Sequence, residues 1–169
     1  MQKPALVSHW SKSVDIVFRV RLWDLDINGH VTNSRYLALM DLGRLQLMRS
    51  LGLLGHIRKN RWVPVLSTVN CSFIKEISWG ANVTLRTRVL GFDSKYWFIQ
   101  QQFYVQDTLH AQALCRGVFL GPHGLVLPEQ VMAYYRDNLA SNESSPPLPQ
   151  FIGLWQKFLQ EFKSSASIR

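Results

Sequence analysis

The chain has 169 residues, of which 47% are hydrophobic and 18% charged, and its formal net charge is +8. Length and apolar content predict one globular domain with a sizeable core, and the longest apolar runs fall far short of the roughly 18 residues that a membrane-spanning helix needs. Residues 1–13 lack the apolar middle of a secretory signal, so we expect a cytoplasmic protein.

The positive charge does not by itself indicate a nucleic-acid partner. The basic residues are dispersed, and no nucleic-acid-binding motif accompanies them, so we expect no such partner. A solvated surface explains them, and so does a small polyanionic ligand such as a phosphorylated cofactor, whose phosphates need only two or three Arg or Lys side chains. Both alternatives stay open.

The first predicted element is a strand at residues 14–23, which alternate in period two. The sequence DLDINGHVTNSR follows at 24–35, with oxygen donors at its first, third and fifth positions and Gly29 at its sixth, as in a calcium loop. An EF-hand has a bidentate Glu at the twelfth position, where this chain has Arg35, and it follows a helix rather than a strand. Calcium is therefore not expected.

No other metal site is expected, because the remaining Cys and His residues share no ligand spacing. They are Cys71, Cys115, His9, His56, His110 and His123.

A long apolar helix is predicted over residues 33–53, capped by Thr32 or Asn33. Four strands then follow at 63–74, 82–90, 95–105 and 109–120, separated by turn signals. In the first of these strands, Val63, Val65, Val69, Cys71 and Phe73 are expected on one face, and in the second, Val83, Leu85 and Val89 are expected to face inward. This order allows an antiparallel five-stranded sheet to wrap around one long central helix, which is an α+β architecture.

The C-terminal part is expected to add a short helix at 128–139, a Ser/Pro-rich linker at 141–150 and an amphipathic helix at 151–169, beyond a main domain at 1–140. The last helix has an apolar face that must be covered. We expect it to dock on its own or a partner subunit; binding to a membrane surface is the alternative.

The sequence RLWDLDINGHVTNSRYLALMDLGR at 21–44 resembles the hotdog-fold acyl-CoA thioesterases of the 4-hydroxybenzoyl-CoA thioesterase-like family. The second Asp, the Gly-His-Val and the Asn-x-x-Tyr-Leu are spaced as in that family. SFIKEISWGANVTLRTRV at 72–89 resembles the family's hairpin, and the likeness runs from about Val14 to Tyr135. The chain departs from the pattern at Thr32, where many relatives have Asn, and at 93–96, where some members carry adjacent Arg residues.

The resemblance implies hydrolysis of acyl-CoA to a free acid and CoA, without metal or other cofactor, in grooves where two protomers join their sheets edge to edge as a dimer or a dimer of dimers. By position, Asp26 matches the family's catalytic carboxylate. The backbone N–H near Asn33 matches the group that polarises the thioester carbonyl. Asp41 and Arg44 form an i, i+3 pair on the predicted helix, a contact that usually only stabilises it. Related enzymes use a helix carboxylate, however, so Asp41 is the reserve candidate.

The residues themselves are consistent with this chemistry, which needs a nucleophile or a base and donors aimed at the developing oxyanion. Gly29 lets the chain turn so that Asp26 faces the helix start, where unpaired N–H groups favour negative charge. Asp26 can then attack directly or orient water. The alternative is a turn carboxylate that binds its own backbone, and His30 is expected to order the turn rather than to act as an acid.

The strands supply the candidates for binding the CoA phosphates, which are Arg86, Arg88, Lys95 and Arg116. Two other functions stay open. One is a hotdog dehydratase or hydratase, which needs a His placed against a carboxylate. The other is a non-catalytic module that binds acyl-CoA or an acyl carrier.

Overall fold

The computed structural model of the protein describes residues 13–139 and 147–166. Strand β1 (Val14–Arg19) leads through a 3-10 turn, η1 (Leu22–Asp24), into the long helix α1 (Asn33–Ser50) and the short helix α2 (Leu53–Lys59). The strands that follow are β2 (Val63–Phe73), β3 (Asn82–Phe92), β4 (Trp97–Val105), β5 (Thr108–Gly121) and β6 (Gly124–Val126). Helices α3 (Pro128–Leu139) and α4 (Gln150–Ala166) complete the described chain.

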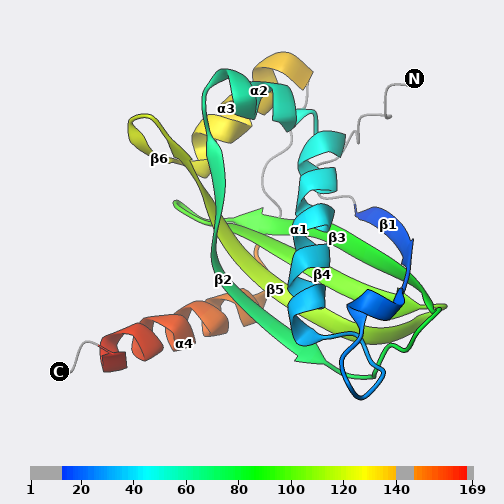
Figure 1. The fold of residues 1–169 in the computed structure, drawn as a ribbon. Helices are drawn as coiled ribbons and strands as arrows, with labels where there is room; N and C mark the ends of the chain where they lie inside the picture. The colour runs from blue at the N-terminus through cyan, green and yellow to red at the C-terminus, as the bar shows by residue number, and fades with distance from the viewer. Residues whose placement is uncertain (1–12, 140–146, 167–169) are drawn as a thin grey trace.

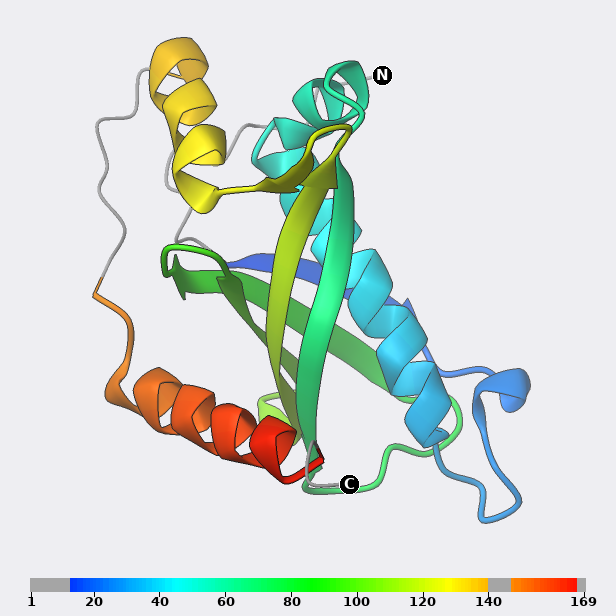
Figure 2. The same cartoon turned by 90° about the vertical axis from the view of Figure 1, so that its left-hand side faces the viewer.

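The strands form one antiparallel sheet in the order β1-β3-β4-β5-β2, and the short β6 pairs with the end of β5. The sheet curls around α1, as Figures 1 and 2 show. The predicted α+β arrangement of a curled sheet around a long helix is therefore confirmed. The sheet has six strands rather than five, because the chain turns back after Gly121 and pairs again, where the sequence indicated only an end to the last strand.

The long helix ends earlier than the sequence predicted. Gly52 has φ +71°, a left-handed conformation that glycine adopts without steric cost, and it separates α1 from α2. The last part of α2 is basic, and Arg58 and Lys59 lie beside the carbonyl end of the helix.

A β-bulge between Leu66 and Thr68 changes which side chains of β2 face α1. The extra residue reverses the alternation, so the expectation that Val63 and Val65 share a face with Val69 is wrong. Val63 is 56% exposed, whereas Val69 packs against the core.

The core lies between α1 and the concave face of the sheet. Along β3, the buried side chains of Val83, Leu85 and Val89 face α1, as predicted. They pack against the buried face of the helix, to which Met40 and Leu47 belong. The alternation of the strand turns its arginines to the opposite, outer face.

Helix α4 packs on this outer face, as Figure 2 shows. Ile152, Trp155 and Leu159 are buried against Leu90 and Phe98 of the sheet. Docking of the last helix on its own subunit is therefore confirmed.

The other flank of α4 is exposed and carries Phe151, Leu154, Phe158 and Phe162. Binding of this exposed flank to a membrane surface stays open. Of the linker predicted at 141–150, residues 141–146 lie outside the described residues. Within 13–139 and 147–166, no helix is long and apolar enough to cross a membrane.

Gly43 sets how closely α1 approaches the sheet. A Cβ atom at this position would lie 2.6 Å from Thr87 Oγ1 and 2.7 Å from Gln101 Nε2, and both of these side chains are fully buried. Neither partner has room to move away, so only glycine allows this spacing.

We predict that Gly43→Ala lowers the free energy of unfolding by about 1–3 kcal/mol, the usual cost of overpacking a core. Gly153→Ala in α4 is the matched control, because its Cβ would meet no atom within 4 Å. In a helix interior this control change is stabilising by up to about 1 kcal/mol. Denaturant unfolding of both variants measures the difference, and equal stability would contradict the close contact.

Candidate active site

The loop between β1 and α1 is closed by backbone hydrogen bonds. Leu25 and Val31 form a β-bridge, and the Asp26 N–H donates to the His30 carbonyl at 2.8 Å. Gly29, at φ +78°, donates to the Asp26 carbonyl at 3.1 Å. The positive φ explains the glycine, and the result is a tight turn that presents Asp26 to solvent.

The Asp26 carboxylate is held by the same turn. Its Oδ1 accepts from the backbone N–H groups of Asn28 at 2.8 Å and His30 at 3.3 Å, while Oδ2 has a longer contact of 3.4 Å with Asn28 Nδ2. The Asn28 N–H, and after it the His30 N–H, lowers the pKa of Asp26. Asp26 therefore makes the backbone contacts expected of a simple turn carboxylate, and these contacts leave it ionised and oriented.

Asp24 holds the loop from inside. It is buried, its Oδ2 accepts from the Arg21 N–H at 2.8 Å, and its Oδ1 lies 2.6 Å from Arg35 Nε. Arg35 thus occupies the side of the loop where a calcium ion would need its strongest ligand. Among the described residues, no group of three or more His, Cys, Asp and Glu is placed to hold a metal.

The N-terminus of α1 is capped by Thr32, one of the two predicted caps. Its Oγ1 accepts from the Arg35 N–H at 3.2 Å. Asn33 is therefore the first helical residue, and its N–H has no preceding turn of helix to bond. This N–H lies at the positive end of the helix dipole, on the same loop as Asp26.

His30 orders the connection between two loops. Its backbone bridges to Ser78, and its Nε2 lies 3.5 Å from Glu76 Oε2. The ring is thus directed to the connection before β3, while its own N–H holds Asp26. This geometry agrees with the expected turn-ordering role.

A cavity of about 250 Å³ lies between the C-terminal half of α1 and the concave face of the sheet. Its lining is apolar except at Asp41 and Arg44, and includes Leu47, Met48, Pro64, Leu66, Trp97, Ile99, Cys115 and Phe119. The Asp41 side chain is 74% exposed and that of Arg44 is 13% exposed. The pair therefore lies where the cavity meets solvent.

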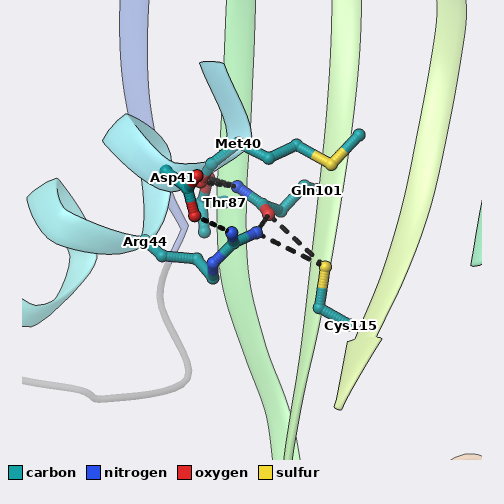
Figure 3. Close-up of polar contacts among 6 residues, drawn as sticks. All are labelled: Met40, Asp41, Arg44, Thr87, Gln101 and Cys115. Carbon is teal, nitrogen blue, oxygen red and sulfur yellow. Dashed lines mark hydrogen bonds and ion pairs between the residues drawn. The ribbon is translucent and has the colours of Figure 1, made fainter. Parts of the chain in front are cut away.

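A buried polar network holds Arg44 in this wall, as Figure 3 shows. Arg44 Nη1 donates to Gln101 Oε1 at 2.7 Å and contacts Cys115 Sγ at 3.7 Å. Gln101 Nε2 donates to the Met40 carbonyl at 2.9 Å and to Thr87 Oγ1 at 3.1 Å. The network ties α1 to three strands across an otherwise apolar core.

Cys115 takes part in this network as a neutral thiol. Burial raises its pKa to about 11, against the smaller opposite effect of Arg44. Cys71 is only half-buried, and burial raises its pKa as well. Neither thiol is therefore a thiolate nucleophile at neutral pH.

Within one chain, the loop and the cavity do not form one compact site. Asp26, His30 and Asn33 are absent from the cavity lining, whereas Asp41 belongs to it. Asn33 and Asp41 are eight residues apart on α1, which is roughly 12 Å along the helix axis.

Three of the four proposed phosphate ligands, Arg86, Arg88 and Arg116, lie on the outer face of the sheet. Arg86 forms a bidentate ion pair with Asp15, in which Nη2 and Oδ2 are 2.8 Å apart. Arg88 Nε donates to Gln100 Oε1 at 2.8 Å. Arg116 is buried, with its guanidinium 4.3 Å from the centre of the Tyr96 ring.

Lys95 is exposed in the turn between β3 and β4. The four cations therefore do not line the cavity, and their role in CoA binding stays a prediction.

Sequence reasoning missed the network around Arg44, which it treated as one half of a surface pair with Asp41. A signal was present in the run Gln100–Gln102, because strand alternation places Gln101 on the same face as Ile99 and Phe103. A polar side chain at a core position needs a buried partner.

The sequence model of the thioesterase-like superfamily matches residues 20–155. Among curated proteins, the chain is 29% identical to the betainyl-CoA thioesterase of Pseudomonas aeruginosa over 136 residues, which is 76% of this chain and 84% of that protein. It is also 29% identical over 100 residues to Protein THEM6 of Danio rerio, covering 58% of this chain but only 50% of that protein.

Solved structures show the same fold at low identity. Gentisyl-coenzyme A thioesterase superposes with a TM-score of 0.62 at 20% identity, covering 72% of this chain and 98% of that one. A Staphylococcus aureus protein determined in complex with CoA gives 0.65 at 18% identity, covering 85% and 93%. A probable thioesterase from Bartonella henselae gives 0.63 at 20%, covering 69% and 98%. The predicted hotdog fold is confirmed.

We predict that Asp24→Asn lowers the free energy of unfolding by about 1–3 kcal/mol, because it removes the charge that pairs with Arg35 while keeping the side-chain size. Asp107→Asn, at an exposed turn position, is the matched control and should be near neutral. Thermal unfolding of the two variants measures this. Equal melting temperatures would show that the Asp24–Arg35 contact does not hold the loop.

Proposed function

Because the chain belongs to the thioesterase-like superfamily, we propose that it hydrolyses acyl-CoA thioesters to a free acid and CoA. The observation that carries the proposal is the loop: an ionised Asp26, oriented by two backbone N–H groups, on the same short segment as the unpaired N–H at the start of α1. The named thioesterases among its relatives, and the similar S. aureus protein that binds CoA, support the substrate class.

In this proposal, the thioester carbonyl oxygen accepts from the Asn33 N–H, which stabilises the negative charge that develops on it. Asp26 either attacks the carbonyl carbon or orients a water molecule that does so. The carbon–sulfur bond then breaks, CoA leaves as the thiol after protonation, and water supplies the oxygen of the acid. Both routes use the same carboxylate.

The apolar cavity is the proposed place for the acyl group. Its hydrocarbon lining favours burial of methylene groups, each of which contributes about 0.8 kcal/mol when removed from water. A chain that fills the cavity is therefore bound more tightly for each added carbon. The binding free energy is expected to become more favourable in proportion to chain length until the cavity is full, and then to stay constant.

Joining two subunits would bring the loop to a cavity. β2 is an edge strand, and its Pro64 and bulge leave Thr68–Phe73 as the regular part available for pairing. Twofold pairing runs the two β2 strands antiparallel and therefore also reverses the two α1 helices. The Asn33 end of one helix then lies level with the partner's cavity, which would remove the separation found within one chain.

The carboxylate on the helix is the reserve candidate, because Asp41 lies on the cavity wall and Asp26 does not. Its carboxylate is engaged in an ion pair with Arg44, whereas a catalytic carboxylate must reach the reacting atoms. Asp26, in contrast, is exposed and is oriented by the backbone N–H groups of Asn28 and His30.

We predict that Asp26→Asn lowers turnover of acyl-CoA by roughly 10²-fold or more, the usual scale for losing a general base or nucleophile, while acyl-CoA still binds. Asp107→Asn serves as the control and should turn over normally. Steady-state thiol release gives the rate, and calorimetric titration with a thioether analogue gives the binding.

Two results would change the assignment. Normal turnover in Asp26→Asn, together with loss in Asp41→Asn, would place the catalytic carboxylate on the helix. Binding of the analogue without thiol release from any acyl-CoA by the unchanged protein would favour the non-catalytic binding module.

Hydration or dehydration of an acyl thioester has one observation in its favour, the approach of His30 Nε2 to within 3.5 Å of Glu76 Oε2. Both side chains are substantially exposed, and neither lines the cavity. Loss of enoyl-CoA absorbance without thiol release would select this function over hydrolysis.

We predict a dimer or a dimer of dimers joined through β2, because an edge strand with exposed apolar side chains such as Phe73 must be covered. Light scattering should give at least twice the chain mass of 19.5 kDa. Cys71→Pro removes a backbone N–H that the alternation of β2 directs away from β5, toward the free edge, and should shift the mass toward the monomer. Asp107→Pro, in a turn away from β2, is the control for a general effect of proline.

A further inference from the structure

One charged pair interrupts the apolar lining of the cavity. Among its lining residues, Arg44 is the only cation and Asp41 the only anion. The Arg44 side chain is 13% exposed, so its guanidinium is largely out of water. A desolvated cation in a hydrocarbon wall is costly and normally indicates a partner or a ligand.

Arg44 is positioned independently of Asp41. Gln101 Nε2 donates to the Met40 carbonyl, which can only accept, so the amide must turn its Oε1 to Arg44. Gln101 is fully buried and cannot swing away. As Figure 3 shows, the guanidinium is thereby held between α1 and strands β4 and β5.

Asp41, in contrast, is weakly held. It is 74% exposed and joins Arg44 through a contact between residues three apart on one helix, a kind of pair that contributes little to stability in water. The carboxylate can therefore turn into solvent at small cost and regain its hydration there. Arg44 would keep its bonds to Gln101 and Cys115, and its Nη2 would become available.

The other groups around Arg44 do not neutralise it. Gln101 is an uncharged amide, and Cys115 remains a neutral thiol because burial raises its pKa to about 11. Among the described residues, the only negative charge against the guanidinium is thus the one that is easily displaced. A ligand carboxylate arriving inside the cavity would form its hydrogen bond in a less polar medium, where such bonds are stronger than at the surface.

We propose that Arg44 is a binding site for a carboxylate carried on the acyl group, and that Asp41 occupies this site as a displaceable counter-ion. The proposal rests on the proposed function in one respect, the use of the cavity for the acyl group. It assigns the substrate class as acyl thioesters with an acidic group on the chain, in addition to the thioester carbonyl. Gln101 is then a positioning residue, which fixes the direction of the guanidinium.

The experiment is a calorimetric titration of the full chain with thioether analogues of acyl-CoA, which are not hydrolysed. Each chain length is made once with a methyl end and once with a carboxylate end. For at least one length, the carboxylate-ended analogue should bind more tightly than its methyl-ended match. Straight-chain dicarboxylic acids are a third probe, which tests Arg44 without requiring any affinity for CoA.

Variants separate the two members of the pair. Asp41→Asn removes the competing anion at an exposed position and should tighten binding of the carboxylate-ended analogue about twofold or more, with no change for the methyl-ended one. Arg44→Met should weaken binding of the carboxylate-ended analogue about tenfold relative to the methyl-ended analogue of the same length. Arg44→Lys keeps the charge but not the planar donors, and should lie between Arg and Met.

The proposal is overturned if methyl-ended analogues bind more tightly at every length, or if Asp41→Asn weakens the carboxylate-ended ligand. The second result needs no change in the core, so it stands even if Arg44→Met fails to fold. Thiol release from methyl-ended acyl-CoA, measured alongside, keeps the two proposals apart. Hydrolysis without a carboxylate preference contradicts only the Arg44 site, whereas dicarboxylate binding without hydrolysis contradicts only the thioesterase.

Discussion

The close contact between α1 and the sheet at Gly43 is the constraint on which the rest of the structure depends. Without a side chain there, the helix approaches near enough for Gln101 to reach the Met40 carbonyl and for Arg44 to reach Gln101. A fully apolar contact would hold the helix as firmly, but it would not fix its rotation. The polar network adds direction to the contact, because a buried hydrogen bond requires its donor and acceptor to be aligned.

The sheet separates two kinds of surface. Its concave face holds α1, the cavity and the network, and its outer face holds α4 together with most of the cations first considered for phosphate binding. Several of those cations are already engaged, Arg86 by Asp15 and Arg116 by Tyr96 and Thr68. Charge on a strand therefore says little about a ligand until its face and its partners are known.

Two carboxylates in the loop before α1 have different surroundings. Asp24 is buried with Arg35 and fixes the path of the chain, which leaves Asp26 at the exposed tip with its charge held by backbone N–H groups. The same residues that gave the loop its likeness to a calcium site thus form an ion pair and a turn. A cation supplied by the chain itself takes the place that an EF-hand gives to its last ligand.

The sequence by itself determined the order of the elements, the α+β fold, the turn at Gly29 and the buried face of β3, because these follow from short-range periodicity and from glycine and capping chemistry. Tertiary structure alone decided the rest. The bulge after Leu66 depends on strand pairing that no local pattern records. Arg44 meets Gln101 across 57 residues of chain, so only the packed core could turn an apparent surface pair with Asp41 into the wall of a cavity.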